Sequence, residues 1–299
     1  NRELFEGLWI GQSDFSWESH PVIRIDFGQF PVGSAEELEE TLRWILHDIA
    51  ERNEITLKGN FIPILFTQLV RQLAKQQGQV AILIDEYDKP ILDNIENTEI
   101  ATQNREGLKN LYSVIKDADP FLKFVLLTGV SKFSKVSLFS GLNNLNDITL
   151  DAKYSAICGY TDTDIDEIFE FELAGLDRDK IREWYNGYNW LGASVYNPFD
   201  VLLLLEKREF KPYWFESATP TFLIKLLGER QVNTLDLAAM HSDQDLLGYF
   251  EVDDIATEAL LFQTGYLTIG AVNEPLPGIW EYTLTYPNVE VEVSLNKAL

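Results

Sequence analysis

The chain has 299 residues, 45% of them hydrophobic, which is enough for a sizeable core and predicts more than one domain. Its net charge is −24, with 48 acidic against 24 basic residues, and such a negative field repels phosphate backbones, so no direct, extended nucleic-acid binding is expected. The single cysteine, Cys158, excludes an internal disulfide and a thiolate zinc cluster, and no long apolar segment predicts a membrane span, so the cytoplasm is the expected setting.

The first part of the chain alternates strand-like and helix-like stretches. Residues 22–27 follow a proline and are rich in β-branched residues, which predicts a strand. Ser34 and Glu37 have the spacing of a capping box at a helix start. The helix itself is predicted by apolar residues at helical spacing: Leu38, Leu42, Ile45, Leu46 and Ile49. A second amphipathic run, residues 62–73, predicts another helix, which Gly78 can end in a left-handed conformation.

A continuous apolar run comes next. Residues 80–84 are all apolar, which is typical of a strand inside a parallel sheet that helices cover on both faces. Residues 108–115 predict a further helix, Asp119-Pro120 a break, and residues 121–127 another apolar strand. Strands that alternate with helices predict an α/β domain with a mainly parallel sheet.

The pattern of apolar and aromatic residues changes after about residue 160. Thr161 and Asp164 resemble another capped helix start. The segments that follow are mostly helical in pattern, with several aromatic residues, and residues 265–269 are predicted to be extended. We therefore expect a helical region and then a smaller mixed unit.

The clearest functional signal is the acidic pair Asp85-Glu86 at the end of the predicted buried strand. In open α/β sheets, ligands bind outside the carboxyl ends of the strands. In ATPases of this plan an Asp here holds Mg²⁺, usually through water, and the adjacent Glu polarises the water that attacks the γ-phosphate. Alone, the pattern fits a solvated acidic turn equally well, but its place in a β–α series favours the nucleotide site. We interpret Asp88 as part of the turn that Pro90 closes.

Thr128, at the exit of the next strand, is the candidate for sensing the γ-phosphate or orienting the water. Its alternative role is a hydroxyl that satisfies a backbone group at a strand end. The chain contains no G-x-x-x-x-G-K-[ST] loop, whose amides and lysine bind the phosphates. In such a fold this loop precedes the first strand and helix, which here means before Asn1. We therefore expect a fragment that does not hydrolyse ATP alone, with cofactor-binding residues that remain unknown.

The chain resembles the AAA-ATPase-like family of prokaryotic proteins, in which a PD-(D/E)XK-type nuclease domain follows the ATPase region. The matching segments run in the expected order along nearly the whole chain: HPVIRIDF (20–27), AILIDEYDKPI (81–91), LTGVSKFSKVSLFSGLNNL (127–145), YSAICGYT (154–161), IREWYNGYNW (181–190), VYNPFDVL (195–202), YWFESATPTFLI (213–224) and LLFQTGYLTI (260–269).

This resemblance implies a P-loop-NTPase-like sheet flanked by helices, followed by a helical lid and a winged-helix-like unit. The corresponding ranges are 1–159 for the ATPase core without its Walker A segment, 160–230 for the lid and 231–299 for the winged-helix-like unit. It also implies a nucleotide-dependent switch that acts on a downstream nuclease-like domain. It gives no role to Trp184–Tyr188, which we interpret as packing and lid contacts because aromatic side chains bury large apolar areas.

The site residues that the resemblance implies are Asp85 for the metal, Glu86 for catalysis and Thr128 for nucleotide sensing, with ATP and Mg²⁺ as ligands. A homo-oligomeric ring is an expectation by analogy with ATPases in general. Arg105 and Arg182 are nominated as its arginine fingers.

Three other functions remain open. A metal-dependent nuclease would use Asp85, Glu86 and Asp88 as direct ligands, although the acidic-x-x-Lys spacing that ends at Lys89 is one residue too long for the usual motif. A glycosidase needs two carboxylates across a cleft, which adjacent residues in an extended strand do not provide. A non-catalytic scaffold is the third.

Overall fold

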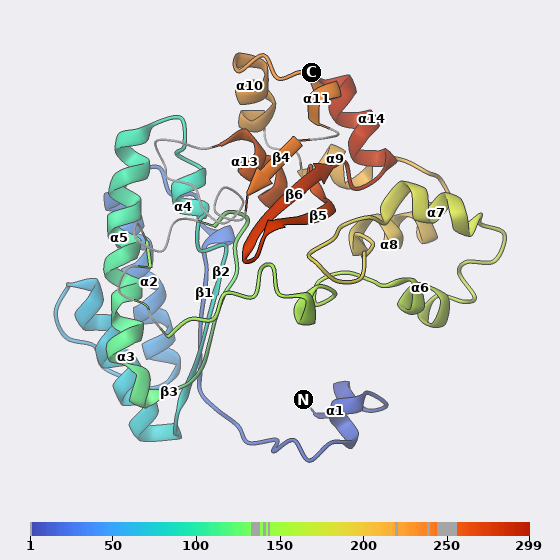
Figure 1. Cartoon of the computed structure of the whole chain (residues 1–299). Coiled ribbons are helices and arrows are strands. Elements are labelled where there is room, and N and C mark those ends of the chain that lie inside the picture. Colours follow the sequence, from blue (N-terminus) through green and yellow to red (C-terminus); the bar gives the residue numbers. More distant parts are fainter. Residues whose placement is uncertain are drawn as a thin grey trace. The chain divides into compact units, whose positions relative to one another are not determined.

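The computed structural model describes residues 2–132, 138–139, 142, 144–218, 221–237, 240–243 and 256–299 (Figure 1). The chain divides into two compact units, each described here by itself. Unit 1 contains Asn1–Asn94, Glu99–Gly129 and Gly141–Asn143, and unit 2 contains Ile95–Thr98, Val130–Ser140 and Asn144–Leu299. The three-part division predicted from the sequence stays a prediction.

Unit 1 contains a parallel sheet of three strands in the order β1-β2-β3, with β2 in the centre. Its elements are η1 (Arg2–Phe5), α1 (Trp9–Gln12), β1 (Val22–Asp26), η2 (Phe27–Gln29), α2 (Ala35–Arg52), α3 (Ile62–Gln77), β2 (Val80–Asp85), α4 (Lys89–Leu92), α5 (Thr98–Asp117), η3 (Asp119–Phe121) and β3 (Leu122–Leu127). The predicted α/β fold with a parallel sheet and flanking helices is confirmed for this unit.

The ends of the first two long helices follow the sequence signals closely. The Ser34 hydroxyl accepts from Glu37 N at 3.2 Å, as a capping box requires. The Glu37 carboxylate, however, accepts from Gly33 N at 2.7 Å, so it reaches one residue further back than predicted. Helix α3 ends at Gln77. The Gly78 that follows has a φ of +93° and a ψ of −175°, so it takes a conformation that favours glycine but not the left-handed helical one that was predicted.

The two faces of the sheet differ in how well they are covered. Figure 1 shows α2, α3 and α5 together on one side of the strands. The side chains of that face are fully buried: Ile23, Ile25, Ile82 and Ile84. On the other face Phe124 is 54% and Leu126 38% exposed, and Leu83 beside them is half-buried. The expectation of helices on both faces of β2 is therefore met on one face by the helices of unit 1.

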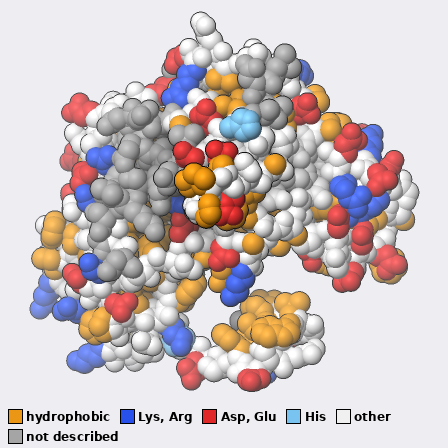
Figure 2. All heavy atoms as spheres, viewed as in Figure 1, with side chains coloured by type: hydrophobic (Ala, Val, Ile, Leu, Met, Phe, Trp, Pro, Cys, Tyr) orange, Lys and Arg blue, Asp and Glu red, His pale blue; other side chains and the backbone are white. Residues whose placement is uncertain are grey.

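The N-terminal segment of unit 1 is rich in exposed apolar side chains, which gather visibly in Figure 2. Phe5 and Phe15 pack on Trp17 with ring centroids 5.2 and 5.3 Å apart. Leu4 and Trp9, by contrast, are 76% and 82% exposed. An exposed patch of this kind is typical of a surface that contacts another part of a protein.

Unit 2 begins as a set of short helices and ends with an antiparallel sheet in the order β4-β6-β5. Its described elements are η4 (Ala152–Tyr154), α6 (Asp162–Ile168), α7 (Arg178–Tyr185), α8 (Pro198–Lys207), α9 (Tyr213–Ala218), α10 (Thr221–Glu229), α11 (Thr234–Leu237), β4 (Met240–Asp243), α13 (Thr257–Gln263), β5 (Thr268–Leu276), β6 (Ile279–Thr285) and α14 (Val289–Ala298). The predicted helix start at Thr161 and Asp164 is a complete capping box with both reciprocal bonds. The extended segment predicted at 265–269 begins only at Thr268.

The aromatic segment after α7 lies in the core of unit 2. Tyr185 is fully buried and Tyr188 is 7% exposed, so the interpretation of this segment as packing is confirmed for both residues. Gly187 between them has a φ of +119°, and a Cβ there would lie 1.8 Å from the carbonyl oxygen of Pro287. The turn before α14 therefore packs directly on the backbone of this segment. In the described part of the chain, no helix has the length and apolar character needed to cross a bilayer.

Candidate functional site

The three parallel strands of unit 1 bring polar residues to one edge of the sheet. The register pairs Asp26 at the end of β1 with Asp85 at the end of β2, and Thr128 follows β3 directly. Thr128 N donates to the Ile84 carbonyl oxygen at 2.9 Å, which extends the ladder by one bond. The Thr128 hydroxyl then donates to Oδ1 of Asp85 at 2.6 Å. The structure thus brings together two of the residues predicted to form the site.

The two oxygens of the Asp85 carboxylate differ in their hydrogen bonds to the described residues. Oδ1 accepts from the Thr128 hydroxyl and also from Glu86 N at 3.1 Å. No described residue donates a hydrogen bond to Oδ2, and the side chain is exposed. An ionised carboxylate oxygen in this position is suited to a hydrated divalent cation, because hard cations prefer oxygen ligands.

Glu86 has a backbone conformation that is uncommon outside glycine, with a φ of +49°. Residues of this kind are concentrated at functional sites, where the surrounding structure enforces them. The turn carries the side chain back toward β1, so that a Cβ on Gly28 would lie only 2.9 Å from Oε1 of Glu86. The carboxylate therefore lies at the edge formed by β1 and β2.

The environment of Glu86 raises the pKa of its carboxyl group. Partial burial is the largest cause, the positive charge of Lys89 acts in the opposite direction, and the negative charges of Asp85, Asp26 and Asp88 raise the pKa further. A partly buried carboxyl with a raised pKa among other acids at a strand end is a candidate for a functional site.

Asp26 belongs to this edge, although sequence reasoning missed it. Its Oδ1 accepts from Gly28 N at 3.0 Å, and its Oδ2 accepts from Arg24 at 2.9 Å and from Gln29 at 2.8 Å. Both oxygens are used by its own turn, so Asp26 contributes negative charge and local order. The signal that could have revealed it is the Ile-Asp ending that β1 shares with β2.

The turn after Asp85 is anchored on two sides. Tyr87 N donates to the Thr128 carbonyl oxygen at 3.0 Å, and the Tyr112 hydroxyl of α5 donates to the Tyr87 carbonyl oxygen at 3.1 Å. Asp88 is 1% exposed, and a Cβ on Gly129 would lie 2.4 Å from its Oδ1. Asp88 therefore belongs to the packed turn, in agreement with its interpretation from the sequence. Among the described residues, no group of three acidic, His or Cys side chains is placed to hold a metal ion.

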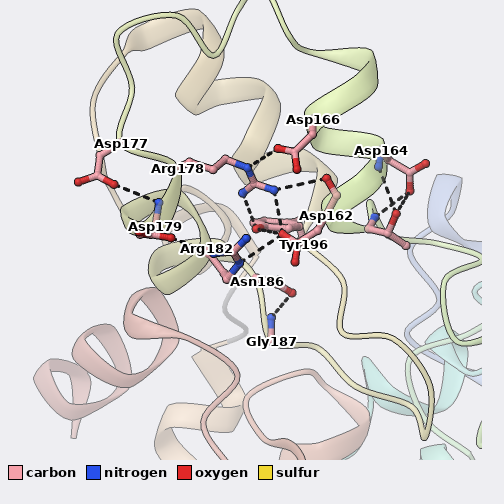
Figure 3. Close-up of polar contacts among 11 residues, drawn as sticks. Asp162, Asp164, Asp166, Asp177, Arg178, Asp179, Arg182, Asn186, Gly187 and Tyr196 are labelled. Atoms are coloured by element: carbon pink, nitrogen blue, oxygen red, sulfur yellow. Dashed lines mark hydrogen bonds and ion pairs between the residues drawn. The ribbon is translucent and has the colours of Figure 1, made fainter.

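The two arginines nominated as arginine fingers both have acidic partners. Arg105 forms an ion pair with Glu106 at 3.3 Å. Arg182 pairs with Asp179 at 2.9 Å and with Asp162 at 3.4 Å, on α7 and at the start of α6 respectively (Figure 3). Neither contact identifies a finger, and this role stays a prediction.

Arg178 is the centre of the polar cluster in Figure 3. Its guanidinium donates to Asp166 at 2.7 Å, to Asp162 at 2.8 Å and to the Tyr196 hydroxyl at 2.5 Å. The Tyr196 hydroxyl itself donates to Asp162 at 2.6 Å. Burial acts to raise the pKa of Asp162, but the hydroxyl and the two arginine charges outweigh it and hold that pKa below its usual value. This cluster joins α6, α7 and the segment that precedes α8, and both of its arginines form ion pairs within unit 2.

Comparison with known proteins finds a family match in the N-terminal part of the chain. The family model described as a predicted AAA-ATPase matches residues 1–139, which include β1, β2, β3, Asp85, Glu86 and Thr128. A protein of Azotobacter chroococcum mcd 1, described as an uncharacterized protein in the vnfD 5′ region, is 54% identical over 301 residues and matches 100% of this chain. The chain spans 58% of that relative's length.

Among solved structures, the Aeropyrum pernix ORC1 protein in complex with DNA matches with a TM-score of 0.31 and 14% identity, over 94% of this chain and 78% of that chain. A likeness at this level supports no statement about fold or ligands. The family match rests instead on the N-terminal sequence, where the strand ends carry the acidic pair and the threonine. The similarity to the AAA-ATPase-like family thus covers residues 1–139 of this chain.

Proposed function

We propose that the chain is part of an ATP-binding and ATP-hydrolysing P-loop ATPase that acts as a nucleotide-dependent switch for a downstream nuclease-like domain. The observation that carries the proposal is the 2.6 Å hydrogen bond from Thr128 to Asp85 at the carboxyl edge of a parallel sheet, with Glu86 next in the chain. This is the edge at which ligands bind in open α/β sheets.

The donor set of this edge fits Mg²⁺. Asp85 offers one oxygen that no described residue uses, and Mg²⁺ in nucleotide sites takes only one or two carboxylates and keeps several waters. When bound with ATP, Mg²⁺ neutralises the charge that develops on the phosphates. In this proposal Asp85 would hold the hydrated ion, Glu86 would accept a proton from the attacking water, and Thr128 would fix Asp85 and contact the γ-phosphate.

The edge strand β3 is where a phosphate-binding element could join the sheet. Among the described strands β3 pairs only with β2, so its second edge offers unpaired backbone groups. Phe124 and Leu126 on β3 also leave an apolar surface open beside that edge. A strand and helix from elsewhere in a longer protein, carrying the phosphate-binding loop, would satisfy both requirements. For this reason the chain alone is expected to bind and hydrolyse ATP poorly.

The C-terminal part of unit 2 is proposed as a helical lid followed by a winged-helix-like unit. The support is the succession of short helices and then a three-stranded antiparallel sheet with α13 and α14. The exposed hairpin of β5 and β6 carries Glu274 and Glu281, so its charge is unfavourable for contact with a phosphate backbone.

The test compares Glu86→Gln with the unchanged sequence in a protein long enough to include a phosphate-binding loop. We expect ATP to bind with unchanged affinity and the rate of hydrolysis to fall by about 10²–10⁴, because the proton acceptor is lost. Glu51→Gln, an exposed position on α2, is the matched control and should leave both values unchanged. Normal turnover in Glu86→Gln would remove Glu86 from the mechanism.

A further inference from the structure

Two carboxyl groups lie deep in the core of unit 2. Asp200 on α8 and Glu290 in the first turn of α14 are both 0% exposed. An ionised carboxylate at such depth is strongly disfavoured unless a cation or several hydrogen bonds compensate for the lost water. How these two groups are satisfied therefore determines what holds α14 in place.

Both carboxyls bond to the same turn of backbone. Trp214 N donates to Oδ1 of Asp200 at 2.8 Å, and Phe215 N donates to Oε1 of Glu290 at 3.1 Å. The remaining oxygens, Oδ2 of Asp200 and Oε2 of Glu290, are buried and have no hydrogen-bond donor among the described residues. The amides that hold the two carboxyls belong to consecutive residues, and each carboxyl influences the pKa of the other.

When both carboxyls are ionised, each presents only hydrogen-bond acceptors to the other. With one proton between them, one carboxyl becomes a donor and the other accepts, so that a single proton satisfies both buried oxygens. Burial raises the pKa of both groups, and the charge of Asp200 raises the pKa of Glu290 further, to about 9. The pair with a single proton is therefore favoured well into the neutral range.

The other titratable groups around the pair are tyrosines. Tyr185 and Tyr188 face both carboxyls from the end of α7 and the segment after it, and Tyr213 faces Asp200 from α9. Burial raises the pKa of each of these hydroxyls, so all three remain neutral when the carboxyls titrate. The groups that act on the Asp200 and Glu290 carboxyls are each other and the α9 amides, and none is a cation.

We propose that Asp200 and Glu290 share one proton, and that this acid pair is a pH-sensitive latch that joins α14 to α8 and α9. While the proton is present, the pair closes the contact between the three helices. When it is lost, two negative charges remain side by side in the core, and their repulsion is relieved only if the first turn of α14 moves away from α8.

The direction of the pH response follows from linkage. The folded protein holds the shared proton more tightly than the unfolded chain, whose glutamate has the ordinary value of 4.5. The contribution of the latch to stability is therefore complete below that value, and it decreases as the pH rises toward the raised folded value. Each pH unit in this range can change the opening equilibrium of α14 by up to about tenfold per proton.

The first test looks for the proton itself. Infrared spectroscopy of the full chain at pH 7 should show the carbonyl stretch of a protonated carboxyl, which titrates away only at alkaline pH. Glu290→Gln and Asp200→Asn should each remove this band, whereas Glu292→Gln, on the exposed side of the same helix, should keep it. The proposal is overturned if the unchanged protein shows no such band, or if the band survives in both amide variants.

The second test measures the latch. Hydrogen exchange of the α14 amides, corrected for the intrinsic dependence on pH, should accelerate at least about tenfold between pH 7 and pH 9 in the unchanged protein and in Glu292→Gln. Glu290→Gln carries a permanent amide donor in place of the titrating proton, so its corrected exchange should be independent of pH. An identical pH response in Glu290→Gln and the unchanged protein would contradict the latch. If Glu290→Gln does not fold, the infrared band of the unchanged protein still decides whether the two carboxyls share a proton.

Discussion

Replacement of Gly187 by alanine tests how the aromatic segment of unit 2 holds the start of α14. Gly187 has a φ of +119°, and an added Cβ would lie 1.8 Å from the carbonyl oxygen of Pro287. The obstructing atom belongs to backbone, so it cannot rotate out of the way as the end of a side chain can. We expect the two segments to be forced apart.

The expected magnitude has two parts. A residue with a Cβ in a left-handed conformation costs about 1–2 kcal/mol. Forcing extra atoms into a packed interior costs about 1–3 kcal/mol more. Gly187→Ala should therefore lower the free energy of unfolding of unit 2 by about 2–5 kcal/mol, a large fraction of the stability of a typical domain.

Gly278→Ala provides the matched control for the backbone part alone. Gly278 lies in the same unit, between β5 and β6, with a φ of +82° and no atom within 4 Å of an added Cβ. It should lose only about 1–2 kcal/mol. Urea unfolding followed by tryptophan fluorescence and by hydrogen exchange of α14 compares the two variants. Equal losses in the two would refute the close packing of Gly187 on Pro287.

Three further predictions concern single side chains. Thr128→Val keeps the shape of the side chain but removes the hydroxyl that donates to Asp85. ATP turnover of the longer protein should fall at least about tenfold, while the free energy of unfolding should fall by only about 1 kcal/mol. Unchanged turnover in a steady-state assay would exclude the proposed role of Thr128. Tyr112→Phe leaves a buried main-chain carbonyl without this donor and should lower the free energy of unfolding of unit 1 by about 1–3 kcal/mol in urea. Because the pKa of Asp162 is lowered in the folded protein, the stability that its cluster contributes is present above the ordinary aspartate value of 3.8 and is lost as the pH falls below it. The thermal midpoint of the unchanged protein should consequently fall more steeply on acidification than that of Arg178→Met, and parallel curves would contradict this reasoning.

The sequence predicts the parallel sheet and three of the four polar residues at its edge for a simple physical reason. Consecutive parallel strands present their carboxyl ends at the same border, so residues that follow two apolar runs must lie near one another. Asp85 and Thr128 are 43 positions apart and still meet at 2.6 Å. Asp26 obeys the same rule, but Arg24 interrupts the apolar run of its strand, so the strand end is less conspicuous in the sequence.

Contacts between helices could not be predicted in the same way. Asp200 and Glu290 lie on helices separated by 90 positions, and nothing in either local pattern states that the two helices touch. Glu290 in fact stands in the first turn of a helix, where an exposed acid is ordinary. Helix packing directions depend on the shapes of all the side chains at the contact, and those shapes have no fixed spacing along the chain.

The geometry of Thr128 and Gly129 also bears on how a nucleotide site could influence the rest of the protein. Thr128 bonds to Asp85 through its hydroxyl and to Tyr87 through its carbonyl, while Gly129 packs on Asp88. Two residues after β3 thus restrain the acidic turn after β2. The same chain enters unit 2 at Val130, immediately after this contact. A displacement of the acidic turn must therefore either break these bonds or move the peptide that leads into unit 2. A ligand that binds more tightly to one of two positions of Asp85 would consequently shift the position of that peptide without any additional contact.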